Sequence, residues 1–214
     1  MVWASWAKRL KISVVAFDIV QFFLSLNHSV LTLILKHFGF SNYIIDFFSD
    51  YLAGRSTQYS WNLFFSGTCD TNVDIEQNST LSLILLVFYI ASFIYIFELR
   101  AQALNLNTSI LSFVDNSLLI CHRKTYNTTL PELFNSYRVI TDLIVLFGLV
   151  MEHGKSEIFY FSRIYNKSNP ELDFSAIGAS TLEPKIYWKY LGFYFYCCLF
   201  FKKHICYYST KVLL

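Results

Sequence analysis

The chain has 214 residues and a formal net charge of +2, from 17 Lys and Arg against 15 Asp and Glu. This length allows one domain with a substantial core, or one and a half small domains. The near-neutral charge, with no long block of basic residues, excludes a strongly basic tail and says little about binding partners.

The composition is unusually apolar. Hydrophobic residues make up 55% of the chain and charged residues 15%, against about 25% charged in an ordinary soluble domain. The chain is therefore either membrane-embedded or an unusual soluble protein. The uncharged apolar run at residues 81–97 is shorter than the roughly 20 apolar residues of a typical membrane span. We therefore do not favour a stable membrane span.

The N-terminus and the cysteines indicate an intracellular protein of the cytoplasm or nucleus. Charged residues interrupt the first apolar stretches, so the secretory signal pattern is missing. The five cysteines contain no C-x-x-C pair, so neither a zinc site nor a disulfide framework is indicated. We expect a chain that is not secreted.

The first predicted element is a buried strand. Residues 12–19, ISVVAFDI, are β-branched and apolar, and Asp18 stands at the end of the run. Apolar residues at helical spacing then predict helices over 28–38 and 42–53.

The next segments predict strands and a long helix. Residues 56–65 and 71–76 are expected to form a hairpin of two strands. Ser79 or Thr80 then caps a long apolar helix that extends to about Arg100.

Residues 108–121 predict a second hairpin. Two short apolar runs flank Asp115-Asn116. Asp and Asn tolerate the left-handed backbone that tight turns need, so we expect the turn at this dipeptide.

The remaining elements complete an α+β pattern. We expect an amphipathic helix over 129–147, a strand over 156–161, a polar loop over 164–184 and an aromatic hairpin over 187–201. This order fits a sheet covered by helices on one face.

Two carboxylates occupy positions that packing alone does not explain. Asp18 ends a buried strand, and Asp115 lies in a tight turn between apolar strands. Carboxylates on such rigid supports can meet at the edge of a sheet and hold the divalent cations of a phosphoryl or nucleotidyl transfer site. Each residue alone is more often an ordinary cap or turn residue.

Several short segments add family information by their order and spacing. They are AFDIVQFFLSLNH at 16–28, VDIEQNSTLSL at 73–83, FVDN at 113–116, GLVMEHGKSEIF at 148–159 and YLGFYFYCCLFFKKH at 190–204. In this order they resemble the reverse-transcriptase palm of LINE-type (non-LTR) retrotransposons, of the kind common in fungal genomes. The resemblance implies an α+β polymerase palm with an antiparallel sheet, partial fingers and no complete thumb.

The resemblance implies roles for the candidate catalytic residues. Asp18 and Asp115 match the family's metal ligands, which hold two Mg²⁺ ions, and the carbonyl of Ile19 lies near a metal. Asn116 stands at the position of the family's second hairpin aspartate. Lys155 matches a lysine proposed to protonate the leaving pyrophosphate.

The resemblance also implies substrate contacts. Phe23 matches the bulky residue that stacks under the sugar and excludes a 2′-hydroxyl. Gln77 and Ser79 match the segment that lines the nucleotide and template side, and Tyr190 and Gly192 match the hairpin that grips the primer. The implied partners are an RNA template, a DNA primer and a dNTP.

The chain departs from the family pattern at constrained positions. Asn116 replaces an aspartate, which removes one negative charge from a site for two dications. Further departures are Leu24 and Leu83 for proline, Glu76 and Asn78 for glycine, and Cys197 for aspartate. Most of these changes run toward A/T-rich codons. We therefore hypothesise that decay of an inactivated element, and not a membrane, explains the high hydropathy.

The resemblance suggests a division of the chain. Residues 1–11 are expected to be a remnant of the fingers, 12–163 the palm with inserted fingers helices, 164–186 a loop, and 187–214 a primer-grip-like hairpin with the start of a truncated thumb. The implied activity is an impaired RNA-directed DNA polymerase. The alternative is a non-enzymatic remnant or a small membrane-associated protein.

Overall fold

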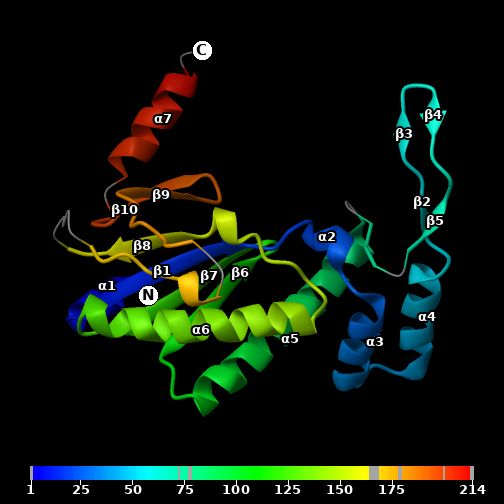
Figure 1. Cartoon of the computed structure of the whole chain (residues 1–214), viewed down its shortest axis with the longest axis horizontal. Helices are drawn as coiled ribbons and strands as arrows, with labels where there is room; N and C mark the ends of the chain where they lie inside the picture. The colour runs from blue at the N-terminus through cyan, green and yellow to red at the C-terminus, as the bar shows by residue number, and fades with distance from the viewer. Residues whose placement is uncertain are drawn as a thin grey trace. The chain divides into compact units, whose positions relative to one another are not determined.

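The computed structural model describes residues 2–71, 73–76, 79–163, 169–177, 180–199 and 201–212 (Figure 1). The chain forms two compact units that alternate along the sequence. The first comprises Met1–Asp18, Glu98–Thr141 and Glu152–Leu214, and the second comprises Ile19–Phe97 and Asp142–Met151.

The first unit is built on an antiparallel sheet of strand order β6-β7-β1-β8. The strands are Thr108–Phe113 (β6), Asn116–Arg123 (β7), Lys11–Asp18 (β1) and Glu157–Phe161 (β8). The strands predicted over 12–19, 108–121 and 156–161 are confirmed. β1 lies in the interior of the sheet, and its apolar run is buried on both faces.

Helix α6 (Tyr126–Leu146) covers one face of this sheet. Odd-numbered residues of β1 point toward it. The Ser13 hydroxyl lies 2.7 Å from that of Thr129, and the Phe17 ring meets Tyr137 edge to face at 6.4 Å. The helix begins three residues before the predicted start at 129, because the Thr125 hydroxyl accepts from the Thr128 N–H and caps it.

The opposite face carries helix α1 (Val2–Ala7) and the hairpin of β9 (Tyr187–Tyr190) and β10 (Phe193–Tyr196). Even-numbered residues of β1 face this side. The shared core consists of Trp6, Ile12, Val14, Leu118, Ile120, Phe159, Phe161, Trp188 and Cys197. One face thus carries a long helix, as predicted, while the other is closed by a short helix and a hairpin.

Further helices were not predicted from the sequence. They are α1, α2 (Phe22–Ser25), α7 (Lys202–Val212) and the 3₁₀ turns η1 (His153–Lys155) and η2 (Ser175–Ile177). Most are too short to show a helical repeat of apolar residues. The aromatic hairpin predicted over 187–201 is confirmed, but its strands end at Tyr196.

The second unit contains helices α3 (His28–His37) and α4 (Asn42–Leu52), both as predicted. The strand bounds predicted for 56–76, namely 56–65 and 71–76, were wrong, because the paired strands all lie within 56–70. β2 (Ser56–Thr57) pairs with β5 (Cys69–Asp70), and β3 (Ser60–Trp61) pairs with β4 (Phe64–Phe65). The chain reverses after Trp61 because Asn62 adopts a left-handed backbone, with φ of 52°.

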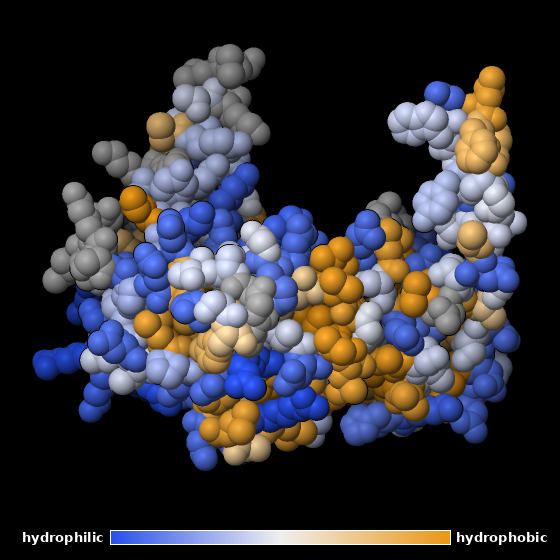
Figure 2. All heavy atoms as spheres, in the orientation of Figure 1, coloured by the Kyte–Doolittle hydropathy of each residue, from blue (hydrophilic) through white to orange (hydrophobic). Residues whose placement is uncertain are grey.

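Helix α5 (Thr80–Ala103) is apolar around its whole circumference. Within the second unit it buries a stripe at helical spacing, made of Ser82, Leu85, Leu86, Tyr89, Phe93 and Phe97. The Tyr89 hydroxyl donates to the Phe147 carbonyl, and burial raises the pKa of this phenol. Other apolar side chains of the helix face solvent, and Figure 2 shows apolar surface over α5.

Among the described residues, α5 is the one helix long and apolar enough to cross a membrane by length and composition. Of its most apolar 18-residue window, 39% is buried within the protein. Core helices of soluble proteins meet the same criteria, so this observation is weak evidence for a span.

Candidate active site

The pairing of β1 with β7 brings the predicted carboxylates to one end of the sheet. Asp18, the last residue of β1, lies opposite Asn116, the first residue of β7. Asp115 directly precedes Asn116, in the turn from β6. The end of β1 and the β6–β7 turn therefore meet at the same edge.

The β6–β7 turn is a two-residue loop of Val114 and Asp115, closed by the pair Phe113 and Asn116. Val114 has a φ of 57°. The expectation that Asp115-Asn116 takes the left-handed backbone is wrong, because Asn116 is already in β7. A β-branched residue in this region is sterically strained.

Asn116 and Asp115 interact directly. The Nδ2 of Asn116 donates to Oδ1 of Asp115 at 2.7 Å. The Tyr190 hydroxyl lies 3.4 Å from the Asn116 carbonyl oxygen. Burial, and then the negative charge of Asp115, raise the pKa of Tyr190. The start of β7 therefore lies beside Tyr190 of β9.

Lys155 approaches the other carboxylate. Its Nζ lies 2.6 Å from Oε2 of Glu152 and 3.3 Å from Oδ2 of Asp18. The Glu152 N–H donates to the Asp18 carbonyl at 3.1 Å, which holds the η1 turn against the end of β1. The hydrogen bonds to Glu152 and Asp18 raise the pKa of Lys155, so its ammonium form is favoured.

Asp18, Asn116, Lys155 and Tyr190 line a cleft of about 170 Å³. Its walls come from the ends of β1 and β7, from η1, and from β8 and β9. The lining residues are Ala16, Phe17, Asp18, Asn116, Ser117, Lys155, Glu157, Trp188, Lys189 and Tyr190. Two carboxylates (Asp18 and Glu157), two lysines (Lys155 and Lys189) and the Tyr190 phenol thus line one small polar cleft.

The donor set suits a hard cation only in part. Within the described part of the chain, no group of three or more His, Cys, Asp or Glu side chains is placed to hold a metal ion. Mg²⁺ is commonly held by one or two carboxylates together with substrate phosphates. Asp18 and Asp115 meet that minimal requirement for one ion. The ammonium of Lys155 and the amide of Asn116 occupy one oxygen of each carboxylate.

The fold resembles solved telomerase structures. No protein-family model matches the chain, and no curated protein sequence is significantly similar to it. An apo telomerase from Candida tropicalis, truncated of its C-terminal domain, matches with a TM-score of 0.59 and 13% identity, over 93% of this chain and 37% of that one. Telomerase from the same species with the TWJ fragment of telomeric RNA matches with a TM-score of 0.62 and 12% identity, over 95% and 32%.

The chain has a palm-like polymerase fold. At this level of identity the likeness establishes the fold alone, and the chain spans about a third of the telomerase chains that it matches. In this palm, the β6–β7 hairpin and the end of β1 carry the two predicted carboxylates.

The other predicted residues are distributed over both units. Gly192, with φ of 83°, forms the β9–β10 turn of the palm, and its carbonyl accepts from the Tyr208 hydroxyl at 3.0 Å. Ile19, Phe23 and Ser79 belong to the second unit. The Ser79 hydroxyl lies 3.3 Å from that of Tyr51.

Backbone contacts hold Ile19 and Phe23 in the second unit. Ile19 forms a bridge with Met151, and the Phe23 carbonyl accepts from the Ile75 N–H at 2.8 Å. Gln77 lies outside the described residues.

Sequence reasoning missed Glu152 as a site residue of the palm. Its carboxylate is the nearer of the two partners of Lys155. The only available signal was its position three residues before Lys155, which places two side chains on one side of a helical turn. That signal is too common to identify a functional residue.

We expect Val114→Gly to increase the free energy of unfolding by about 1 kcal/mol, because glycine adopts a positive φ without steric cost. Urea unfolding followed by circular dichroism measures this change. The matched control is Val145→Gly, at a 72% exposed position in helix α6. It should destabilise by about 1 kcal/mol. Equal destabilisation by both variants would show that the turn is not strained.

Proposed function

We propose that this chain is the palm of a reverse transcriptase, descended from a LINE-type retrotransposon and impaired in catalysis. The proposed reaction is RNA-directed nucleotidyl transfer from a dNTP to a primer 3′-hydroxyl. The observation that carries the proposal is the meeting of Asp18 and the Asp115 hairpin at one end of a palm-like sheet. A telomerase of similar fold is complexed with a fragment of telomeric RNA, which supports an RNA template as partner.

The carboxylates Asp18 and Asp115 would hold the metal. When bound, Mg²⁺ supplies the positive charge that activates the primer hydroxyl and stabilises the leaving pyrophosphate. The resemblance implies two ions. We propose that Asp18 and Asp115 hold at least one of them together with substrate phosphates.

Lys155 would act on the leaving group. Its amine is protonated at neutral pH and so carries a proton. The hydrogen bonds to Glu152 and Asp18 raise its pKa, so donation would require a substrate phosphate to replace these contacts. Its side chain is 59% exposed, and an incoming phosphate can reach it. Its position beside Asp18 is suited to proton transfer near the reacting phosphate.

The proposed substrate contacts complete the site. Phe23 would exclude a 2′-hydroxyl, Gln77 and Ser79 would line the nucleotide side, and Tyr190 and Gly192 would contact the primer. These roles follow from the sequence resemblance.

Asn116 accounts for the proposed impairment. An aspartate at this position would add a negative charge beside Asp115, whereas the amide adds none and donates a hydrogen bond to Oδ1 of Asp115. That bond uses an oxygen which would otherwise be available to a cation. The substitution thus weakens the cation site in both charge and geometry.

We expect Asn116→Asp to raise Mg²⁺-dependent primer extension on poly(rA)/oligo(dT) by roughly tenfold or more, since about 1.4 kcal/mol of transition-state stabilisation corresponds to a factor of ten. Adding Asp18→Ala to this variant should abolish extension. The matched control Asn105→Asp makes the same change in a turn outside the cleft and should have no effect. Extension that survives Asp18→Ala would refute the site, and no extension in any variant would favour a non-enzymatic remnant.

Lys155→Gln should tighten Mg²⁺ binding severalfold, because the ammonium group that now contacts Oδ2 of Asp18 competes with the cation. Calorimetric titration of the purified chain with MgCl₂ measures the change. Lys36→Gln, in helix α3, removes the same charge away from the cleft and serves as the control. If both variants shift the affinity equally, only net charge matters and Asp18 is not a ligand.

Membrane association is a second candidate, favoured by one observation. Helix α5 exposes Leu83, Ile84, Val87 and Tyr95 along the part that belongs to the second unit. A membrane-bound chain should partition into the detergent-soluble membrane fraction, with the segment 81–97 protected from protease. Replacement of Leu83 and Val87 by Ser should release it, whereas the same change at exposed Leu146 and Val145 of α6 should not. Recovery of the unaltered chain in the aqueous fraction would exclude this candidate.

A further inference from the structure

A second cleft lies at the opposite end of β1 from Asp18, in the first unit. It has a volume of about 240 Å³ and is lined by Trp6, Arg9, Leu10, Lys11, Ser162 and Arg163. These residues come from α1, the connection into β1, the first residue of β1 and the end of β8. Of the cleft's lining residues within the described part of the chain, none is acidic.

The cleft contains three cations, Arg9, Lys11 and Arg163. In the described part of the chain, no ion pair involves Arg9, Lys11 or Arg163. Lys11 lies over the Tyr126 ring, with Nζ 5.5 Å from its centroid. This contact orients the ammonium group and leaves its charge in place.

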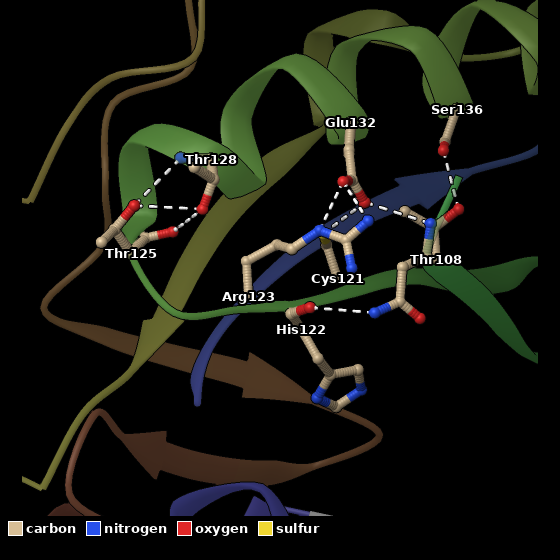
Figure 3. Close-up of polar contacts among 9 residues, drawn as sticks. Thr108, Cys121, His122, Arg123, Thr125, Thr128, Glu132 and Ser136 are labelled. Carbon is tan, nitrogen blue, oxygen red and sulfur yellow. Dashed lines mark hydrogen bonds and ion pairs between the residues drawn. The ribbon is translucent and has the colours of Figure 1, made fainter. Parts of the chain in front are cut away.

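A neighbouring hollow differs in its charge balance. It is larger, about 620 Å³, and it also contains an arginine, Arg123. The Arg123 guanidinium is paired with Glu132, which also accepts from the Asn107 N–H (Figure 3). Burial lowers the pKa of His122 there, so its neutral form is favoured. Of these two hollows, the smaller cleft therefore has cations without carboxylate partners among the described residues and no acidic lining residue.

Trp6 supplies a second, independent feature of the smaller cleft. Its side chain is 96% buried, since only 4% of its surface is exposed. The indole N–H is shielded from solvent and has no hydrogen-bond partner in the described structure. Buried donors are nearly always satisfied, and Trp6 is a lining residue of the cleft, so a bound acceptor is a candidate partner for this N–H.

We propose that this cleft binds a phosphate group. The ligand chemistry follows from three cations, a buried donor and no lining carboxylate. The volume is smaller than the roughly 300–1,000 Å³ of pockets for drug-sized ligands and suits a small anion. The phosphate is either part of a nucleic-acid backbone or a free phosphate ion.

The backbone at Arg9 supports the assignment. Arg9 follows helix α1 with a φ of 56°, at a position where glycine is common. The Arg9 N–H donates to Trp6 O at 3.1 Å and the Leu10 N–H to Ser5 O at 2.9 Å, which fixes this conformation. The backbone at this glycine-type position therefore places Arg9 among the lining residues of the cleft.

The cleft is separate from the candidate active site. Lys11 and Asp18 are the first and last residues of β1, and the strand between them is about 23 Å long at roughly 3.3 Å per residue. Binding here needs neither the carboxylates nor a divalent cation. Phosphate binding in this cleft is therefore expected whether or not the chain has polymerase activity.

The test measures binding of a fluorescently labelled single-stranded oligonucleotide to the full chain, by anisotropy in EDTA over a range of salt concentrations. The double variant Arg9→Gln/Arg163→Gln should bind about tenfold more weakly at low salt. Its slope of log affinity against log salt should fall by about 1.4, because each phosphate that a cation neutralises contributes about 0.7 to the slope. Trp6→Phe, which keeps an aromatic ring and removes the N–H, should weaken binding severalfold.

The matched control is Arg100→Gln/Arg138→Gln, which removes two exposed arginines of the same unit outside the cleft. This control should not weaken binding. Circular dichroism of each variant establishes that it is folded.

A competition arm distinguishes the two sources. The cleft is assigned to free phosphate if inorganic phosphate binds the unaltered chain in calorimetry and displaces the oligonucleotide. Inorganic phosphate must also fail to bind the Arg9→Gln/Arg163→Gln variant. Binding of the oligonucleotide that resists inorganic phosphate assigns it to the nucleic-acid backbone. Equal affinity of the cleft variant and the arginine control for both probes would overturn the proposal, as would binding to anionic vesicles alone.

Discussion

The antiparallel pairing of β1 with β7 is the interaction on which both candidate sites depend. Its register places Asp18 opposite Asn116 at one end and Lys11 opposite Arg123 at the other. A slip of one residue would turn every side chain of β1 to the opposite face. Ile12 and Val14 would then leave the core under the hairpin, and Asp18 would turn away from the cleft. Burial of the apolar residues on both faces of β1 therefore also positions its charged ends.

The two carboxylates of the candidate active site are each paired with a nearby donor. Lys155 lies between the carboxylates of Glu152 and Asp18, while Asn116 binds the carboxylate of Asp115. A carboxylate at position 116 would repel Asp115 and increase the demand for a cation. The amide instead satisfies Asp115 locally. An amide at position 116 therefore permits an arrangement in which the carboxylates of Asp18 and Asp115 each already have a partner.

The aromatic and aliphatic excess has consequences for packing. The hairpin of β9 and β10 covers its face of the sheet with aromatic rings, and Trp188 lies 5.8 Å from Phe159. Helix α5 buries one stripe and still exposes apolar side chains on other faces. The hydropathy of the chain thus exceeds what its core requires. A chain whose surface has become apolar by mutation would have this property, and so would a chain that binds a lipid surface.

The sequence by itself determined the elements with strong local signals. The β-branched run at 12–19, the helical repeats at 28–38 and 42–53 and the paired runs at 108–121 all led to the observed elements. The position of Asp18 at a strand end also followed from local pattern. Each of these signals depends on the alternation or helical repeat of apolar residues, which sequence displays directly.

Tertiary structure alone decided which distant groups meet. Glu152 reaches Lys155 and Asp18 only through the η1 turn, and Trp6, Lys11 and Arg163 share a cleft only because α1, β1 and β8 come together. Valine disfavours the left-handed backbone that Val114 adopts. Pairing of the flanking strands β6 and β7 imposes this conformation. Local pattern specifies what each segment can become, whereas the burial of apolar faces against one another specifies the register, and register decides which charges become neighbours.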